Sequence, residues 1–300
     1  MNNLRIISED DVASVLTMAE LIPCMADALV AYSRGEFAQP VRTIIGVPGH
    51  GGFFGAMPAA SATGLGSKLV AFYPSNTEKG IDSHQGLIAL FDPETGVPTA
   101  IMDGRLITEM RTAAVTAAFI DAAAPPKVRT FAMLGAGLQG SAHIEALRCV
   151  RDIDEIRIWN RTTERAERLA EETGAVVASS CREAVEGADV VVTATAATQP
   201  IIDGDWLKPG VRLASVGFGG FDGGELDEKT MRNTVVVDYR EGALAEPKHV
   251  KRFNAEIYAE LGEVIAGDKP LSANETVVFD SLGMACEDIA SAALVLQKLG

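Results

Sequence analysis

Near-continuous runs of valine and isoleucine alternate with helical segments from residue 128 onward, and this alternation most constrains the fold. The strand-like runs cover residues 128–137, 155–161, 175–179, 189–195, 211–217 and 234–239. Strands that are buried on both faces of a parallel sheet have such unbroken apolar runs. Amphipathic segments such as 138–150 separate them. The sequence therefore predicts an α/β domain of the Rossmann type with a doubly wound parallel sheet.

The residues before this region predict a second, smaller α+β domain. A helix is expected over 11–35 and another over 107–124, with Thr108 as its N-cap. Strands are expected over 41–47, 67–74, 85–92 and 97–104, and the segment DPETG (92–96) indicates a hairpin turn. Because a helix cannot easily continue into Pro125-Pro126, we expect the domain boundary there.

A glycine-rich loop follows the first strand of the α/β domain. It has the pattern GxGxxG and consists of Gly135, Ala136, Gly137, Leu138, Gln139 and Gly140. The pattern alone is weak, but here it ends a strand and opens a helix. In that context the glycines allow a tight turn, and the free N–H groups of the helix face a pyrophosphate. The loop therefore predicts a dinucleotide site.

The residues after the second strand indicate which dinucleotide binds. NAD enzymes carry an Asp or Glu there that binds the ribose hydroxyls. This chain has Asn160, Arg161 and Thr162 instead. Without an acid to repel a 2′-phosphate, and with Arg161 able to pair with it, NADP(H) is favoured over NAD(H).

Overall composition excludes several other classes of protein. Acidic residues outnumber basic ones by 41 to 26, which gives a net charge of −15 and argues against nucleic-acid binding. The four cysteines form no CxxC and the four histidines no HxxxH, so no metal site is expected. Acids occupy positions 9–11, where a signal peptide would be apolar. We expect a cytoplasmic protein that does not associate with membranes.

Three basic residues of the first domain lie in apolar segments. Lys68 lies in LGSKLVAFY, Arg42 in VRTII and Arg111 near the start of an alanine-rich helix. A buried cation requires an anionic partner. In an acidic protein these residues suggest a carboxylate-binding cluster, although spacing alone does not show that they converge.

Taken together, these segments resemble the ornithine cyclodeaminase/mu-crystallin family of NAD(P)-dependent enzymes. The most specific motifs are RTAAVTA (111–117), WNRT (159–162), AELGEVI (259–265) and SLGMA (281–285), and the likeness covers nearly the whole chain. The ketimine reductase branch is the most similar. The resemblance implies a homodimer. It also implies a substrate-binding and dimerisation domain of residues 1–124 with the C-terminal helix 284–300, and an NADP-binding domain of residues 125–283.

The resemblance also implies roles for individual residues. Arg42, Lys68 and Arg111 would hold the substrate carboxylate, with Lys68 and Arg111 as the catalytic residues, and Glu256 would lie near the substrate. The residues expected around the cofactor, besides the glycine-rich loop and residues 160–162, are His84, Arg111, Thr112, Arg165, Thr195, Ala196, Val216, Gly217 and Ser281.

One position departs from the cyclodeaminase pattern. Cyclodeaminases carry an Asp that serves deamination and ring closure, and alignment on Glu225-Leu226-Asp227 places Gly219 there. Asp222, three residues later, could replace that Asp only if the loop rearranged. We therefore expect NAD(P)H-dependent reduction of a small cyclic imino acid, of the delta-1-pyrroline-2-carboxylate or delta-1-piperideine-2-carboxylate type. The alternatives are an ornithine cyclodeaminase, an amino-acid dehydrogenase, or a non-catalytic NADPH-dependent binder of small ligands.

Overall fold

The chain divides into two compact units. The computed structural model describes residues 4–218, 220 and 223–300. One unit comprises Met1–Arg111 with Gly283–Gly300, and the other comprises Thr112–Leu282. The division falls inside helix α3 (Arg105–Ala123), which contributes residues to both units. The sequence-based boundary at 124/125 lies at the end of this helix instead, because the proline pair ends the helix without separating the two packed cores.

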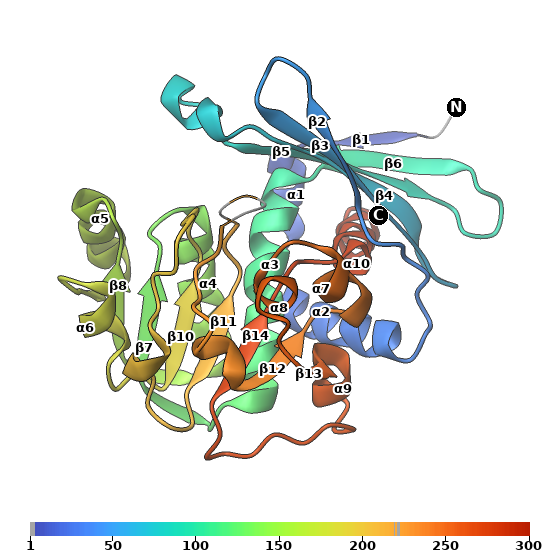
Figure 1. The fold of residues 1–300 in the computed structure, drawn as a ribbon. Coiled ribbons are helices and arrows are strands. Elements are labelled where there is room, and N and C mark those ends of the chain that lie inside the picture. Colours follow the sequence, from blue (N-terminus) through green and yellow to red (C-terminus); the bar gives the residue numbers. More distant parts are fainter. Residues whose placement is uncertain (1–3, 219, 221–222) are drawn as a thin grey trace. The chain divides into compact units, whose positions relative to one another are not determined.

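The second unit contains an eight-stranded sheet with the order β13-β12-β14-β11-β10-β7-β8-β9. The strands are β7 (Lys127–Leu134), β8 (Asp152–Trp159), β9 (Val176–Val177), β10 (Val190–Thr193), β11 (Arg212–Ser215), β12 (Thr234–Val237), β13 (Ile257–Glu260) and β14 (Val277–Asp280). Every pairing found among its described strands is parallel (Figure 1). The doubly wound parallel sheet is thus confirmed. The strand order reverses between β7 and β10, and open α/β sheets bind ligands at such a switch point.

Helices of the second unit connect these strands. They are the C-terminal part of α3, α4 (Leu138–Val150), α5 (Thr163–Thr173), α6 (Cys181–Val185), α7 (Arg240–Ala245), α8 (His249–Phe253) and α9 (Leu261–Ile265), with short 3₁₀ turns at Gly204–Trp206 and Thr230–Arg232. The central strands are buried throughout, and Leu134, Val191 and Leu213 belong to one apolar core. Burial of each such side chain stabilises the unit by about 1.5–3 kcal/mol.

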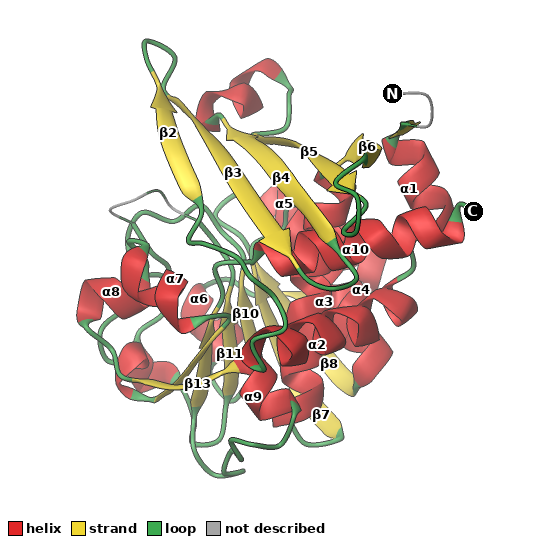
Figure 2. Cartoon of the chain, turned by 90° about the vertical axis from the view of Figure 1, so that its right-hand side faces the viewer, coloured by secondary structure: helices red, strands yellow, loops and turns green. Residues whose placement is uncertain are grey.

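The first unit contains a six-stranded sheet with the order β1-β6-β5-β4-β3-β2. Its strands are β1 (Arg5–Ile7), β2 (Thr43–Val47), β3 (Gly52–Ala60), β4 (Leu65–Phe72), β5 (His84–Phe91) and β6 (Pro98–Asp103), and its helices are α1 (Glu9–Val15), α2 (Met18–Ser33) and α10 (Ala285–Lys298), with a 3₁₀ turn at Pro74–Lys79. The strands from β2 to β6 pair antiparallel. Helix α10 packs against α2 and against β3, β4 and β5 (Figure 2). The C-terminal helix α10 therefore completes the core of the unit that is formed mainly by the N-terminal residues.

Local structure differs from the sequence-based expectation at several places, including the unexpected strands β1, β13 and β14. The helix expected over 11–35 is broken, because Leu16 and Thr17 are extended and separate α1 from α2. Strand β3 was not expected, since its glycines and a proline obscure the alternating pattern. Helix α3 begins at Arg105 and not after Thr108. The Asp103 carboxylate accepts a hydrogen bond from the Arg105 N–H at 2.8 Å, while the Thr108 hydroxyl donates to the Gly104 carbonyl.

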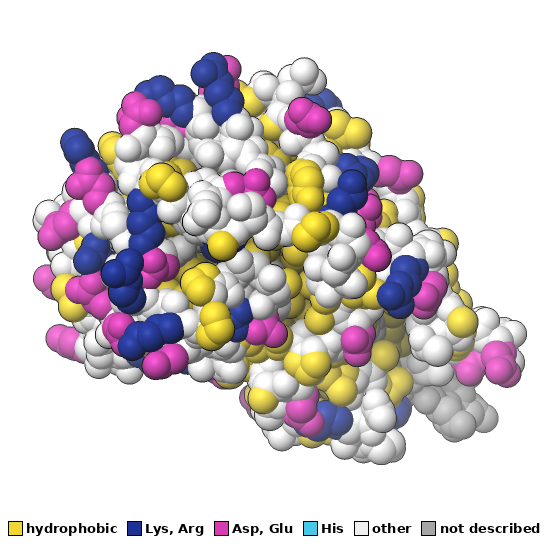
Figure 3. All heavy atoms as spheres, turned by 90° about the horizontal axis from the view of Figure 1, so that it is seen from below, with side chains coloured by type: hydrophobic (Ala, Val, Ile, Leu, Met, Phe, Trp, Pro, Cys, Tyr) yellow, Lys and Arg dark blue, Asp and Glu magenta, His cyan; other side chains and the backbone are white. Residues whose placement is uncertain are grey.

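Within the described part of the chain, no single helix has both the length and the apolar composition to cross a membrane. One bent pair, α1 with α2, passes that test on length and composition alone. On the face drawn in Figure 3, basic side chains lie among acidic ones.

Candidate functional site

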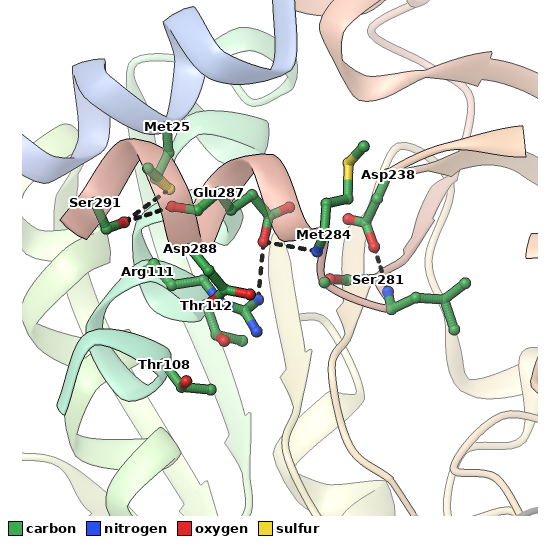
Figure 4. A network of polar contacts seen from close by, with 12 residues as sticks. Met25, Thr108, Arg111, Thr112, Asp238, Ser281, Met284, Glu287, Asp288 and Ser291 are labelled. Carbon is green, nitrogen blue, oxygen red and sulfur yellow. Dashed lines mark hydrogen bonds and ion pairs between the residues drawn. The ribbon is translucent and has the colours of Figure 1, made fainter. Parts of the chain in front are cut away.

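A buried charged cluster lies in the first unit, where β4, α3 and α10 meet. The Lys68 Nζ lies 2.7 Å from an Asp288 carboxylate oxygen. The Arg111 guanidinium contacts the other Asp288 oxygen through Nε at 3.1 Å and Glu287 through Nη1 at 2.9 Å (Figure 4). The predicted convergence of Lys68 and Arg111 is therefore present: Asp288 of α10 links them, and Glu287 binds Arg111.

Burial governs the electrostatics of this cluster. Lys68 is 2% exposed, and Glu287 and Asp288 are 0% exposed. Burial lowers the pKa of Lys68 to about 8; Asp288 opposes this effect, whereas the charges of Arg111 and Arg42 add to it. Lys68 can therefore gain and lose a proton near neutral pH.

Arg42 and His84 lie near this cluster. The Arg42 Nη2 donates to the Gly283 carbonyl at 2.5 Å. The His84 ring contacts the Phe72 ring at a tilt of 39°, with centroids 4.5 Å apart. Its pKa is lowered to about 4, because protein atoms displace water around it and because Lys68 and Arg111 are positive. With Lys68 protonated, three basic side chains and two acidic ones leave an excess of one positive charge, which suits a monocarboxylate.

The local sequence explains why Lys68 points inward. Side chains of a strand alternate between the two faces of a sheet, and Gly66 and Lys68 occupy buried positions of β4. In register with Lys68 lie Met57 on β3 and Ile88 on β5, both buried and apolar. The sheet thus offers Lys68 no anion, and its partner comes from α10.

The sequence did not identify Glu287 and Asp288. Both lie in the first turn of α10, where the Glu287 carboxylate also accepts from the Met284 N–H at 3.1 Å. The available signal was two adjacent acids in the otherwise apolar segment 284–296. A charge within a buried helix face requires a partner.

The glycine-rich loop of the second unit has the geometry that its pattern predicts. Gly135 has φ +118°, and a Cβ there would lie 2.5 Å from the Ala194 carbonyl oxygen. A Cβ at Gly140 would lie 2.3 Å from the Gly135 oxygen. At Gly137, the N-cap residue of α4, a Cβ would have no other atom within 4 Å among the described residues. The loop is therefore tight at its ends and open in the middle, which fits a pyrophosphate at the helix N-terminus.

Among the residues that follow β8, Asn160 binds the glycine-rich loop, whereas Arg161 and Arg165 are exposed. The Asn160 Oδ1 accepts from the Ala136 N–H at 3.1 Å, and its Nδ2 donates to the Thr162 carbonyl at 2.8 Å. The Arg161 and Arg165 side chains are exposed, and neither has a polar partner among the described residues. Two free guanidinium groups beside the loop fit an additional phosphate.

The remaining predicted cofactor residues of the second unit gather at the carboxyl ends of its strands. Thr195 and Ala196 follow β10, Val216 and Gly217 follow β11, and Ser281 follows β14. Beneath them lies Glu225, a buried residue to which the sequence assigned no role. Thr112 belongs to the same unit and lies next to Arg111 along α3.

Several predicted residues are not brought into these groups. Glu256 immediately precedes β13, at the amino end of its strand, and lines an open cavity of about 550 Å³ with Glu228, Arg232 and Tyr258. Thr195 and Gly217 lie at the carboxyl ends of the parallel strands, whereas Glu256 lies at an amino end. The structure therefore does not bring Glu256 to the cofactor residues of its own unit. Gly219 and Asp222 lie outside the described residues.

Comparison with known proteins assigns the family. The model of the ornithine cyclodeaminase/mu-crystallin family matches residues 3–300. The chain belongs to this family. The ketimine reductase mu-crystallin of Mus musculus is 47% identical over 283 residues, which cover 92% of this chain and 90% of the mouse protein.

Two solved structures are similar to this chain over nearly its whole length. The delta(1)-pyrroline-2-carboxylate reductase of Thermococcus litoralis, solved with NADH and L-proline, is 33% identical with a TM-score of 0.91 and covers 98% of this chain and 97% of its own. An archaeal alanine dehydrogenase dimer with bound NAD is 29% identical with a TM-score of 0.91, and covers 98% of this chain and 95% of its own. The Rossmann-type domain of this family member is thus shared by enzymes that use pyridine nucleotides.

Proposed function

We propose that this protein reduces a small cyclic imino acid to the corresponding cyclic amino acid with a pyridine nucleotide. The observation that carries the proposal is the cluster of buried Lys68 and Arg111 with the half-buried Arg42. Together with Glu287 and Asp288 it holds one excess positive charge, on a chain that also carries a dinucleotide loop. A substrate with one carboxylate and a C=N bond matches both features. The similarity to a ketimine reductase and to a pyrroline-2-carboxylate reductase supports this substrate class.

In this proposal each basic residue has a distinct role. The guanidinium groups of Arg42 and Arg111 bind the carboxylate, since planar donor pairs suit carboxylate oxygens. Lys68 donates a proton to the imine nitrogen as the C=N bond becomes a C–N single bond. When bound, NAD(P)H supplies the hydride that the imine carbon receives. Asp288 and Glu287 keep Arg111 and Lys68 in place, so that most of the rate comes from orientation.

Assembly and location are part of the same proposal. We propose a homodimer, with residues 1–124 and 284–300 binding substrate and forming the interface and residues 125–283 binding the cofactor. The archaeal alanine dehydrogenase that resembles this chain is a dimer, which supports this assembly. We also propose that the protein acts in the cytoplasm.

NADP(H) is the proposed cofactor, and Arg161 gives the test. Arg161→Ala should weaken NADPH binding by about 1–3 kcal/mol, because a charge-assisted hydrogen bond to the 2′-phosphate is lost. NADH binding should change little, as NADH has no such phosphate. Titrations of both nucleotides, followed by their fluorescence, measure this. Arg168→Ala, an exposed arginine on the helix α5 that follows Arg161, is the control. An equal loss for both nucleotides would show that Arg161 does not recognise the 2′-phosphate.

The activity itself is tested by a substrate panel. Purified protein should oxidise NADPH in the presence of delta-1-pyrroline-2-carboxylate or delta-1-piperideine-2-carboxylate and form proline or pipecolate. With ornithine and oxidised cofactor, ammonia release should be undetectable or very slow. Gly219 has no side chain that could serve as a base, and an ammonium with a pKa near 10 is a poor nucleophile at pH 7.

The other outcomes identify the alternatives. Efficient proline formation from ornithine would favour a cyclodeaminase and implicate Asp222. Oxidative deamination of an amino acid such as alanine, without imine reduction, would favour a dehydrogenase. Tight NADPH binding with no turnover across the panel would favour the non-catalytic binder.

A further inference from the structure

Glu225 is a fully buried carboxylate at the carboxyl ends of two adjacent strands of the second unit. It is 0% exposed. One oxygen accepts from the N–H and hydroxyl of Thr195, at 2.6 and 2.7 Å. The other accepts from the hydroxyls of Thr193 and Ser215 and from the Gly217 N–H, at 2.7, 2.9 and 2.9 Å. Five donors from the ends of β10 and β11 therefore converge on one side chain.

This carboxylate is costly to bury, and it forms no ion pair with the described residues. Among the described residues no basic side chain lies within 4.0 Å of the Glu225 carboxylate. Desolvation of an ionised carboxylate is expensive, and the five hydrogen bonds are the direct contacts that offset it. If this position served only to stabilise the fold, an apolar side chain of similar volume would be sufficient.

The geometry of the two strand ends depends on Glu225. Thr193 and Ser215 are in register as the last residues of β10 and β11, and Thr195 and Gly217 each follow by two residues. A Cβ at Gly217 would lie 2.4 Å from the Glu225 carboxylate carbon and 2.3 Å from the Thr195 carbonyl oxygen. The carboxylate thus occupies the space that a side chain at position 217 would need.

The same strand end touches the dinucleotide loop. A Cβ at Gly135 would lie 3.3 Å from the Thr195 Cγ2 and 2.5 Å from the Ala194 oxygen. The Ala194 N–H also donates to the Leu134 carbonyl at 2.8 Å, so this strand end lies beside the residue that precedes the loop. Ligands of doubly wound sheets bind outside the carboxyl ends of these strands, at the switch point between β7 and β10.

We propose that Glu225 is a positioning residue for the nicotinamide half of the dinucleotide, because it fixes the backbone of Thr195 and Gly217 on adjacent strand ends. It acts through these residues and does not itself contact the cofactor. This inference rests on the proposed pyridine-nucleotide cofactor and assigns a role within that site.

The chemistry of the five donors suggests a decisive substitution. Hydroxyl groups can reverse and accept a hydrogen bond, but backbone N–H groups cannot. The two backbone donors, Thr195 N–H and Gly217 N–H, bind different oxygens of Glu225. In Glu225→Gln one of those oxygens becomes an NH₂ group, so no orientation of the amide satisfies both backbone donors. The variant keeps the size of the side chain and releases one strand end.

Binding measurements on the purified protein test the proposal without turnover. Glu225→Gln should weaken NADPH binding by about tenfold or more, as expected for one buried donor left unsatisfied. Binding of 2′,5′-ADP, which lacks the nicotinamide half, should change by less than about threefold. Thr193→Val is the matched control, since it removes one hydroxyl donor but keeps both backbone bonds and the charge. Its NADPH affinity should stay within about threefold of wild type.

A second variant guards against a folding defect. Should Glu225→Gln fail to fold, Glu225→Asp retains the charge but is too short to reach both strand ends. It should show the same selective loss of NADPH over 2′,5′-ADP. Wild-type NADPH affinity in either folded variant, equal loss of both ligands, or failure of both variants to fold would overturn the role of Glu225. Absence of NADPH and NADH binding by the wild-type protein would refute the proposed function, and this inference with it.

Discussion

Replacing Lys68 with methionine is expected to lower kcat/KM for a cyclic imino acid by about 10²–10⁴-fold, the usual contribution of a positioned general acid. Methionine fits between Met57 and Ile88 without introducing a polar group. NADPH affinity and the circular dichroism spectrum should remain close to wild type, because Lys68 belongs to the first unit and the loop to the second. Lys127→Met, at an exposed ion pair, is the control. An unchanged rate in Lys68→Met with NADPH bound would remove Lys68 from the mechanism.

The same residue sets an expected pH dependence. The protonated form of Lys68 is the proton donor, and its pKa is lowered to about 8 by burial. Below that pH the donor is present; above it, kcat/KM should fall as the amine loses its proton, approaching tenfold per pH unit. This is measured by initial rates between pH 6 and 10, with an imine substrate whose charge does not change over that range. Residual activity of Lys68→Met should lack the decline near pH 8, and a decline that persists in the variant would assign the titration to another group.

Asp288→Asn is expected to have the largest effect on stability. Asp288 is the buried partner of both Lys68 and Arg111, so the substitution leaves buried positive charge uncompensated. Removal of one partner of a buried ion pair costs about 3–5 kcal/mol of unfolding free energy. For a chain of this size, that loss corresponds to a fall in Tm of about 5–8 °C. Urea unfolding and calorimetry provide the two measurements.

The matched control for this prediction is another Asp→Asn change at an ion pair in water. Asp154 pairs with Lys127 at 3.0 Å, and both side chains are exposed. Asp154→Asn should change the unfolding free energy by less than about 1 kcal/mol. Similar losses in the two variants would show that Asp288 is not a special charge partner. A stable Asp288→Asn protein with normal imine reduction would contradict the role given to the whole cluster.

The sequence by itself determined features that depend on neighbouring residues in the chain. The turn at Gly135, the open position at Gly137 and the close packing at Gly140 follow from glycine at those positions. The unbroken apolar runs likewise required a sheet that is covered on both faces. Strand β13 (IYAE) lacks an unbroken apolar run and, like β14, was not predicted, whereas the equally short β10, β11 and β12 were. The break at Leu16 and Thr17 in the expected first helix was missed because the apolar periodicity continues through it.

Tertiary structure alone decided which charges meet. Lys68 and Asp288 are 220 positions apart in the chain, and α10 brings them to 2.7 Å. The sequence marked Lys68 as a cation in need of an anion but not which of the 41 acidic residues supplies it. Glu225 was similarly hidden, because its five donors come from two strands that precede it. The physical reason is common to both: the sequence shows the cost of burying a charge, whereas only the folded chain shows which distant group offsets it.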